Sequence, residues 1–391
     1  MSEQAAAAPS PSEMMPEELA YRAGTGWVGV VTAAAAVASC VIVLNQLLNL
    51  GFFVGATLGP IPSAGYPLFS VFFPFYGHGE VAVDLFFSIS GFIFYWLYAR
   101  AIASTAVSAG RFFILRFSRL YPLHLLTLLV VAILQLAYRR AGHGYFVYTG
   151  NTASNFVINL LFIPAWVSGG FSFNAPVWSV SVEVFLYGLF FVLCRFLPIS
   201  VITLGAASVF GMLGFWPFPP LLARGMISFF VGGIAALIYE RVTARPDARR
   251  AALLVVGLTA VSGVLFVLGI ELNVMRMVAR DTLRKTAVLG LFPAAVLSLA
   301  LLERTFGWRL RRLRVLGDIS YAVYLWHFPL QLATVLLVDM LGVSHHVFTS
   351  PVALLAFFVA LASLGYASVY GFERPAQAFL RSRLIRPSRA A

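Results

Sequence analysis

Three ionisable side chains open an otherwise apolar stretch of the chain, FYGHGEVAVDLFFSISGFIFYW (75–96). Glu80, Asp84 and Ser88 recur every four residues, so on a helix they share one face. A charge inside an apolar span is costly unless it is paired or faces water. We therefore expect Asp84 to face a cavity or a basic partner. Glu80 and the preceding His78 are also compatible with simple solvation in the headgroup region.

A second polar stripe lies in NAPVWSVSVEVFLYG (174–188), where Ser179, Glu183 and Tyr187 recur every four residues inside an apolar run. We place Glu183 at a depth comparable with Asp84. Two carboxylates that approach one cavity from different helices suit general acid or base catalysis. A hydrogen bond between helices that only orders the bundle accounts for the same pattern.

Arginines and aromatic residues alternate in RFFILRFSRLYPLHLL (111–126), which contains Arg116, Arg119 and Tyr121. The guanidinium fork binds phosphate through two parallel hydrogen bonds, so this segment suits a phosphate-bearing cofactor. Positive charge is also expected at the cytoplasmic end of any membrane span, and that simpler interpretation stays open.

A fourth polar face lies in LGDISYAVYLWHFPL (316–330), where Ser320, Tyr324 and His327 share one side of a helix. A histidine inside a span is a functional candidate, and it can equally be a structural hydrogen-bond donor to a neighbouring helix. The later segment FERPAQ (372–377) contains an adjacent Glu and Arg, which we interpret as an interfacial end signal with a salt bridge.

Composition indicates that membrane helices position these residues. The chain has 391 residues, of which 60% are hydrophobic and 11% charged, whereas soluble domains carry about 25% charged residues. The net charge of +12 comes mostly from arginines beside apolar runs, and this pattern argues against a nucleic-acid-binding face. The two cysteines fall inside apolar runs, so no disulfide framework is expected.

We expect an all-α integral membrane protein with about ten transmembrane helices. The predicted spans are 27–50, 81–102, 118–138, 176–195, 199–215, 222–240, 250–269, 284–302, 319–340 and 351–371. With both termini in the cytoplasm, 20 of the 27 basic residues lie on the inner side, as the positive-inside rule requires.

The rest of the chain is expected to form tails and connections around this membrane domain, 27–377. Residues 1–26 have the composition of a disordered cytoplasmic tail, and residues 378–391 that of a basic cytoplasmic tail. Two long outer segments, 51–80 and 139–175, are apolar enough to fold back over a site as lids.

Five motifs occur in an order that resembles the acyltransferase-3 family of membrane O-acyltransferases: AVDLFFSISGFI, LRFSRLYPLHLL, PVWSVSVEVFLY, LGDISYAVYLWHFPL and FERP. The resemblance covers nearly the whole of 27–377. It implies an acyl-CoA donor, most simply acetyl-CoA, that arrives from the cytoplasm, and a hydroxyl of a glycan or lipid-linked saccharide as acceptor. Similar enzymes acetylate O-antigens, exopolysaccharides, Nod factors and some antibiotics, so a bacterial inner-membrane location is expected.

The motifs and this resemblance together give three groups of expected site residues, with no metal among their ligands. We expect a catalytic group of His78, Asp84 and Glu183, a donor-binding group of Arg116, Arg119, Tyr121, Tyr324 and His327, and an acceptor-binding group of Ser88, Ser90, Trp178, Ser179 and Asn45.

One segment departs from the family pattern. Members usually place an Arg and a His in the first span, and that His is the expected base. In TAAAAVASCVIVLNQLL (32–48), Asn45 or the adjacent glutamine stands near the position of the His, and alanine near that of the Arg. An amide cannot take a proton from a hydroxyl at neutral pH. Either His78 supplies the base, or the chemistry relies on Glu183 or Asp84, or the chain is impaired.

Two further functional classes are compatible with the sequence. In a transporter or exporter of glycans, the polar stripes would line a path across the membrane. In a non-catalytic relative, the same bundle would bind acyl-CoA or a partner without covalent chemistry, as the missing first-span His allows.

Overall fold

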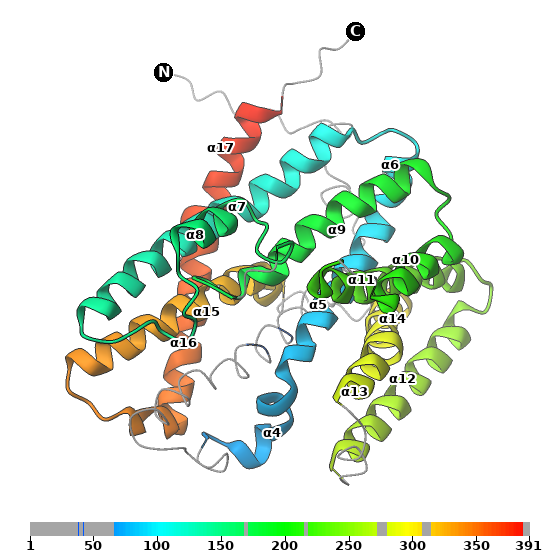
Figure 1. The fold of residues 1–391 in the computed structure, drawn as a ribbon. Helices are drawn as coiled ribbons and strands as arrows, with labels where there is room; N and C mark the ends of the chain where they lie inside the picture. The colour runs from blue at the N-terminus through cyan, green and yellow to red at the C-terminus, as the bar shows by residue number, and fades with distance from the viewer. Residues whose placement is uncertain are drawn as a thin grey trace, which may run out of the picture.

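The computed structural model describes residues 38, 42, 66–167, 171–214, 218–271, 280–306 and 314–385, and these residues form helices and connections without a strand (Figure 1). The helices are α4 (Phe69–His78), η2 (Gly79–Val81), α5 (Ala82–Leu97), α6 (Ala99–Ala103), α7 (Ala109–Arg140), α8 (Ala153–Leu160), α9 (Val177–Phe196), α10 (Val201–Leu213), α11 (Pro220–Thr243), α12 (Ala248–Glu271), α13 (Arg280–Thr286), η4 (Ala287–Leu291), α14 (Phe292–Phe306), α15 (Arg314–Met340), η6 (His345–Thr349), α16 (Pro351–Ser368), η7 (Val369–Glu373) and α17 (Arg374–Leu384).

The structure confirms an all-α membrane bundle. Within the described ranges, eight segments are long and apolar enough to cross a bilayer, and α10 is a shorter apolar helix. These nine segments correspond to nine of the predicted spans. The predicted span 27–50 lies outside the described residues except for Ala38 and Ile42, which are helical and buried.

The ends of two spans differ from the prediction because polar helical turns extend beyond the apolar runs. Helix α7 begins at Ala109 rather than at residue 118, since Ser108 caps it by accepting a hydrogen bond from the Arg111 backbone N–H at 3.3 Å. The last span runs from Pro351 to Leu384, into the segment expected to be a basic tail. Hydropathy marks the part of a helix in hydrocarbon, whereas capping marks where the helix ends.

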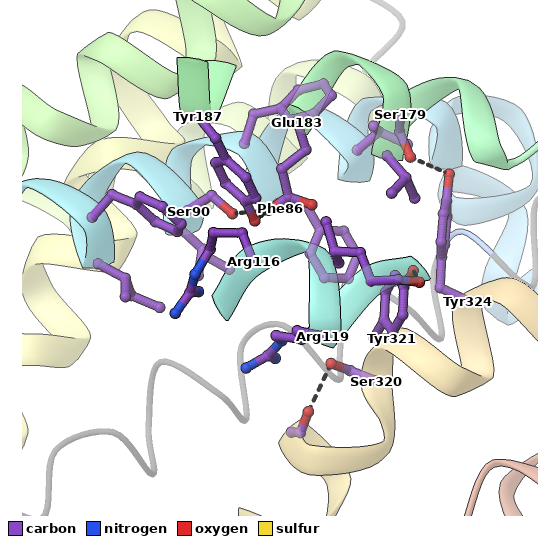
Figure 2. A pocket seen from close by; sticks show the side chains of 18 residues that line it. Phe86, Ser90, Arg116, Arg119, Ser179, Glu183, Tyr187, Ser320, Tyr321 and Tyr324 are labelled. Atoms are coloured by element: carbon purple, nitrogen blue, oxygen red, sulfur yellow. Dashed lines mark hydrogen bonds between the residues drawn. The ribbon is translucent and has the colours of Figure 1, made fainter. Parts of the chain in front are cut away.

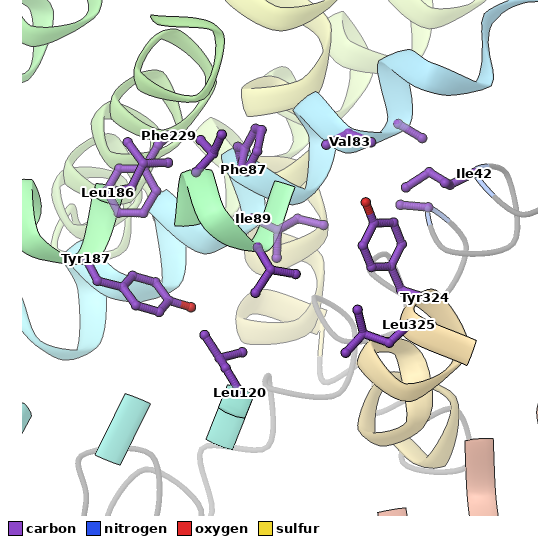
Figure 3. Close-up of a cluster of buried hydrophobic side chains, with 14 of the residues drawn as sticks. Ile42, Val83, Phe87, Ile89, Leu120, Leu186, Tyr187, Phe229, Tyr324 and Leu325 are labelled. Atoms are coloured by element: carbon purple, nitrogen blue, oxygen red, sulfur yellow. The ribbon is translucent and has the colours of Figure 1, made fainter. Parts of the chain in front are cut away.

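Helix α11 is central to the described bundle, where it packs against α5, α9, α10 and α14 (Figure 1). On one side of it, α12 packs on α14. On the other, α7 packs against α15 and α17, and α16 packs on α15. A buried apolar core that includes Phe87, Leu186 and Phe229 fills the space between α5, α9 and α11 (Figure 3).

Helices α5 and α11 approach closely because each has a glycine that faces the backbone of the other helix. A methyl group at Gly91 of α5 would overlap the backbone oxygen of Phe229, and one at Gly232 of α11 would overlap that of Ser88. Small residues allow such contacts between helices in membranes, where packing and hydrogen bonds drive association. This contact fixes the position of α5, the helix that contains Asp84 and Ser90.

The described part of the outer segment 139–175 folds onto the bundle, as the sequence predicts. Buried side chains hold it by bonds to backbone atoms: Nε2 of His124 contacts the carbonyl of Asn159 at 2.8 Å, and Nδ2 of Asn174 donates to the carbonyl of Leu325 at 3.1 Å. The indole of Trp166 donates to the carbonyl of Ser181 at 2.9 Å. The segment is therefore a fixed cover rather than a free linker.

Replacing Gly91 by Ala should lower the apparent melting temperature of the detergent-purified protein, because overpacking forces α5 away from α11. The expected loss in the free energy of unfolding is about 1–3 kcal/mol. The matched control is Gly257→Ala on α12, where a methyl group meets nothing within 4 Å and a small gain in helix stability is expected. Equal melting temperatures for the two variants would contradict the close contact.

Candidate functional site

A cavity of about 170 Å³ lies between α5, α7, α9 and α15 (Figure 2). Helix α5 contributes more of its lining than any other element, chiefly through apolar side chains. Six of the predicted site residues line it: Ser90, Arg116, Arg119, Ser179, Glu183 and Tyr324. Four segments far apart in the sequence thus bring together one carboxylate, two guanidinium groups and several hydroxyls.

The two arginines on the pocket differ in their surroundings. Arg116 is 5% exposed, its Nη2 donates to the hydroxyl of Tyr98 at 2.7 Å, and its guanidinium lies 5.2 Å from the ring centre of Phe94. Aromatic faces stabilise a cation in this position and also orient it. Arg119, one turn further along α7, is exposed. Figure 2 shows both on one side of the cavity, away from Ser179 and Tyr324.

Glu183 lies between these two sides of the cavity and is held by hydroxyl groups. Its Oε1 accepts from Ser90 at 2.8 Å and from Tyr187 at 2.5 Å, and Tyr187 stacks on Phe94 with ring centres 4.5 Å apart. Both bonds end on the same oxygen, and they orient the side chain through Oε1. Among the described residues that line the pocket, Glu183 is the one carboxylate.

The opposite side of the cavity presents hydrogen-bond acceptors. The hydroxyls of Ser179 and Tyr324 lie 2.7 Å apart, and both reach the backbone oxygen of Pro176, at 3.2 Å and 2.8 Å. Each hydroxyl has one proton. One proton goes to the Pro176 carbonyl and the other joins the two hydroxyls, so only lone pairs remain. This pair can accept a hydrogen bond from a ligand hydroxyl or amide N–H.

Asp84 does not line the pocket. It is fully buried, and Arg224 binds it through two nitrogens, with Nε 3.0 Å from Oδ1 and Nη2 2.7 Å from Oδ2. Ser228 donates to Oδ1 at 3.0 Å, and Arg284 lies 3.7 Å from the same oxygen. The sequence placed Asp84 with Glu183 on one cavity, whereas the structure gives the two carboxylates separate partners on separate helices.

Other predicted site residues pack around the pocket without lining it. Ser88 donates to the carbonyl of Ser228 at 3.1 Å, and Trp178 lies under Arg224, whose guanidinium is 5.4 Å from the indole. Tyr121 stacks on Phe117 with ring centres 4.5 Å apart.

Of the three remaining predicted residues, the structure describes the side chain of His327. It is fully buried, with Nδ1 2.5 Å from the backbone oxygen of Tyr324. The backbone of His78 ends α4, and its side chain lies outside what the structure describes. Asn45 lies outside the described residues as well.

Sequence reasoning missed the role of Arg224 and the contribution of Tyr98. Arg224 counted only as an outer charge in the topology, although it lies five residues inside α11, where an arginine needs a partner. The partner of Asp84 could have been sought there. Tyr98 gave no signal, because an aromatic residue near the end of an apolar helix is ordinary.

Comparison with known proteins identifies the family. Residues 54–369 match the model of the acyltransferase-3 family, described as an acyltransferase domain. The chain belongs to the acyltransferase-3 family. Its apolar helices and this family membership make it a multi-pass membrane protein. The acyltransferase-3 match begins after the segment 32–48 that departs from the family pattern.

Parts of the chain also align with two known proteins. The alignment with the acyltransferase MdmB of Streptomyces mycarofaciens is 29% identical over 140 residues and covers 34% of this chain and 33% of that protein. The alignment with protein 2 in the picA locus of Rhizobium radiobacter is 32% identical over 115 residues and covers 27% of this chain and 60% of that protein. The chain thus spans less than two thirds of either relative. No solved structure matches it.

Replacing Asp84 by Asn should destabilise the protein, because it leaves the partly buried guanidinium of Arg224 without its carboxylate partner. The expected cost is about 3–5 kcal/mol, measured by thermal unfolding in detergent. The double variant Asp84→Asn, Arg224→Gln should recover part of that loss. As a control, Asp247→Asn breaks an exposed pair with Arg245 and should leave stability within about 0.5 kcal/mol. Unchanged stability in Asp84→Asn would contradict a structural pair.

Proposed function

We propose that the protein transfers an acyl group, most simply acetyl, from acyl-CoA to a hydroxyl of a glycan or glycolipid. The observation that carries this proposal is the polarity of one cavity. Two guanidinium groups lie at one side, an oriented carboxylate lies between, and an acceptor-only hydroxyl pair lies opposite (Figure 2). The guanidinium groups can bind phosphates, the carboxylate can remove a proton, and the hydroxyl pair can accept a hydrogen bond from a ligand hydroxyl or amide.

In this proposal the donor phosphates bind Arg119 and Arg116, and the pantetheine arm extends between α5 and α15 towards Glu183. The basic end of the pocket faces the cytoplasm of a bacterial inner membrane, as the distribution of basic residues supports. The acceptor approaches from the side of Ser179 and Tyr324.

Glu183 is the proposed general base. It takes the proton of the acceptor hydroxyl as that oxygen attacks the thioester carbonyl carbon. The carbon–sulfur bond then breaks, the CoA thiolate leaves, and the proton held by Glu183 passes to that sulfur. Ser90 and Tyr187 donate to Oε1 and so keep the carboxylate in one rotamer during both transfers.

The hydrogen bonds of Ser88, Ser90 and Ser179 do not support a role as oxyanion donors. Ser88 donates to Ser228, Ser90 donates to Glu183, and the proton of Ser179 is used within the pair with Tyr324 and Pro176. We therefore assign Ser90 to orientation of the carboxylate and Ser179 to orientation of the bound hydroxyl, whereas Ser88 joins α5 to α11.

Replacing Arg119 by Ala should raise the KM for acetyl-CoA by about tenfold or more with a smaller change in kcat, because the lost contact is to the donor phosphates. Acetyl-pantetheine, which lacks those phosphates, should react equally with both proteins. The control is Arg100→Ala, which removes an exposed arginine paired with Glu240. An equal loss with acetyl-pantetheine would show that Arg119 does not contact phosphate.

Replacing Glu183 by Gln should lower kcat by about 100-fold or more, since a positioned base contributes that much to proton transfer. Binding of CoA, measured by calorimetry, should stay within about threefold of the original, a small change in affinity. Glu240→Gln makes the same chemical change outside the pocket and should retain activity. Full activity of the Glu183 variant would move the base elsewhere, and absence of transfer by the unmodified protein with any acceptor would count against an enzyme.

A further inference from the structure

Glu373 is a buried carboxylate that the proposed reaction does not use. It ends the π-helical segment η7, between α16 and α17, and its residue is 6% exposed. Gln377 donates to its Oε1 at 3.0 Å, while its Oε2 is buried without a hydrogen-bond partner. Single π-helical turns inside α-helices are frequent at functional sites, and a buried polar atom without a partner needs an explanation.

The salt bridge expected within FERPAQ does not form between neighbours. Arg374 instead pairs with Asp318 of α15, with Nη2 3.2 Å from Oδ2. The salt bridge of this segment thus joins Arg374 to another helix, and the span continues past it to Leu384, so the interpretation as an end signal is wrong. The Glu373 side chain is instead buried, where a different cation acts on its carboxylate.

The candidate cation is Arg119 of α7, the helix against which η7 packs. Among charged groups, Arg119 acts most strongly on the Glu373 carboxylate, ahead of Arg374, and Asp318 is the opposing anion. The charge of Glu373 also reaches Tyr321. Arg119 and Tyr321 both line the pocket, and η7 packs against their helices, α7 and α15. Glu373 therefore belongs to a segment that packs on the two helices carrying Arg119 and Tyr321.

We infer that Glu373 is a positioning residue that sets the affinity of this site for the phosphates of CoA, acting through Arg119. The inference rests on the proposed donor. In a medium of low dielectric, a carboxylate behind a guanidinium competes with any anion in front of it. Binding of the donor must weaken the attraction between Arg119 and Glu373, so the acid lowers the affinity for CoA. A product that keeps the same phosphates then leaves more easily.

The test is direct binding of CoA to the detergent-purified protein at pH 8, measured by calorimetry. Glu373→Gln should bind CoA at least about fivefold more tightly, a coupling typical of linked sites. In an Arg119→Ala background the same substitution should have less than half that effect on a logarithmic scale, because the acid acts through the arginine. Turnover should show a lower KM and a lower kcat where product release limits the rate.

A second variant keeps the test valid if Glu373→Gln folds poorly. Gln377→Glu adds a carboxylate four residues along the same helix face, at a half-buried position, and should weaken CoA binding at least about threefold. Glu240→Gln removes one negative charge from an ion pair outside the pocket and should leave CoA binding unchanged.

The outcomes separate the two proposals. Tighter binding by Glu373→Gln, or weaker binding by Gln377→Glu, with the effect reduced when Arg119 is absent, supports the inference. If the unmodified protein binds CoA and neither substitution changes the affinity, the inference is wrong and the proposed donor is still supported. An equal effect in the Arg119→Ala background overturns action through Arg119. Absence of CoA binding by every protein overturns the proposed donor and this inference with it.

Discussion

One buried carboxylate joins the helices on which the pocket depends. Asp84 of α5 accepts hydrogen bonds from Arg224 and Ser228 of α11 and lies beside Arg284 of α13. A paired charge away from water tolerates little displacement, since separation would leave each ion in an apolar surrounding. The glycine contact between α5 and α11 brings the backbones close enough for this pairing. Together they fix the helix that supplies more of the pocket lining than any other.

Three of the polar groups at the cavity are oriented by a neighbouring group. Tyr98 orients Arg116, the lining residues Ser90 and Tyr187 orient Glu183, and the backbone oxygen of Pro176 orients the Ser179–Tyr324 pair. Orientation by bonds made before a ligand arrives reduces the reorganisation needed during a reaction. The apolar remainder of the lining excludes water and so strengthens each of these interactions.

Much of the fold follows from sequence, because apolar runs of about 20 residues have few alternatives in a bilayer. Periodicity also identified Ser179, Glu183 and Tyr324 as one-sided polar positions, and these do meet at the pocket. It could not tell which neighbouring helix each stripe faces. Asp84 and Ser88 face α11 rather than Glu183. The reason is that an arginine inside an apolar helix needs a carboxylate partner, and Asp84 pairs with the arginine of α11. Such pairings depend on helix rotation and crossing, which spacing along one helix does not encode.

The length of the last span has a consequence for where the pocket opens. Its 34 residues extend over about 51 Å at 1.5 Å per residue, whereas the hydrocarbon layer is about 30 Å thick. The surplus turns of α17 stay beside α7, since Nε of Arg381 donates to Ser118 at 3.2 Å. These surplus turns therefore run beside the part of α7 that carries Arg119. In the proposed orientation, phospholipid headgroups at the cytoplasmic surface would present the same chemical group as the proposed donor and would compete for Arg119.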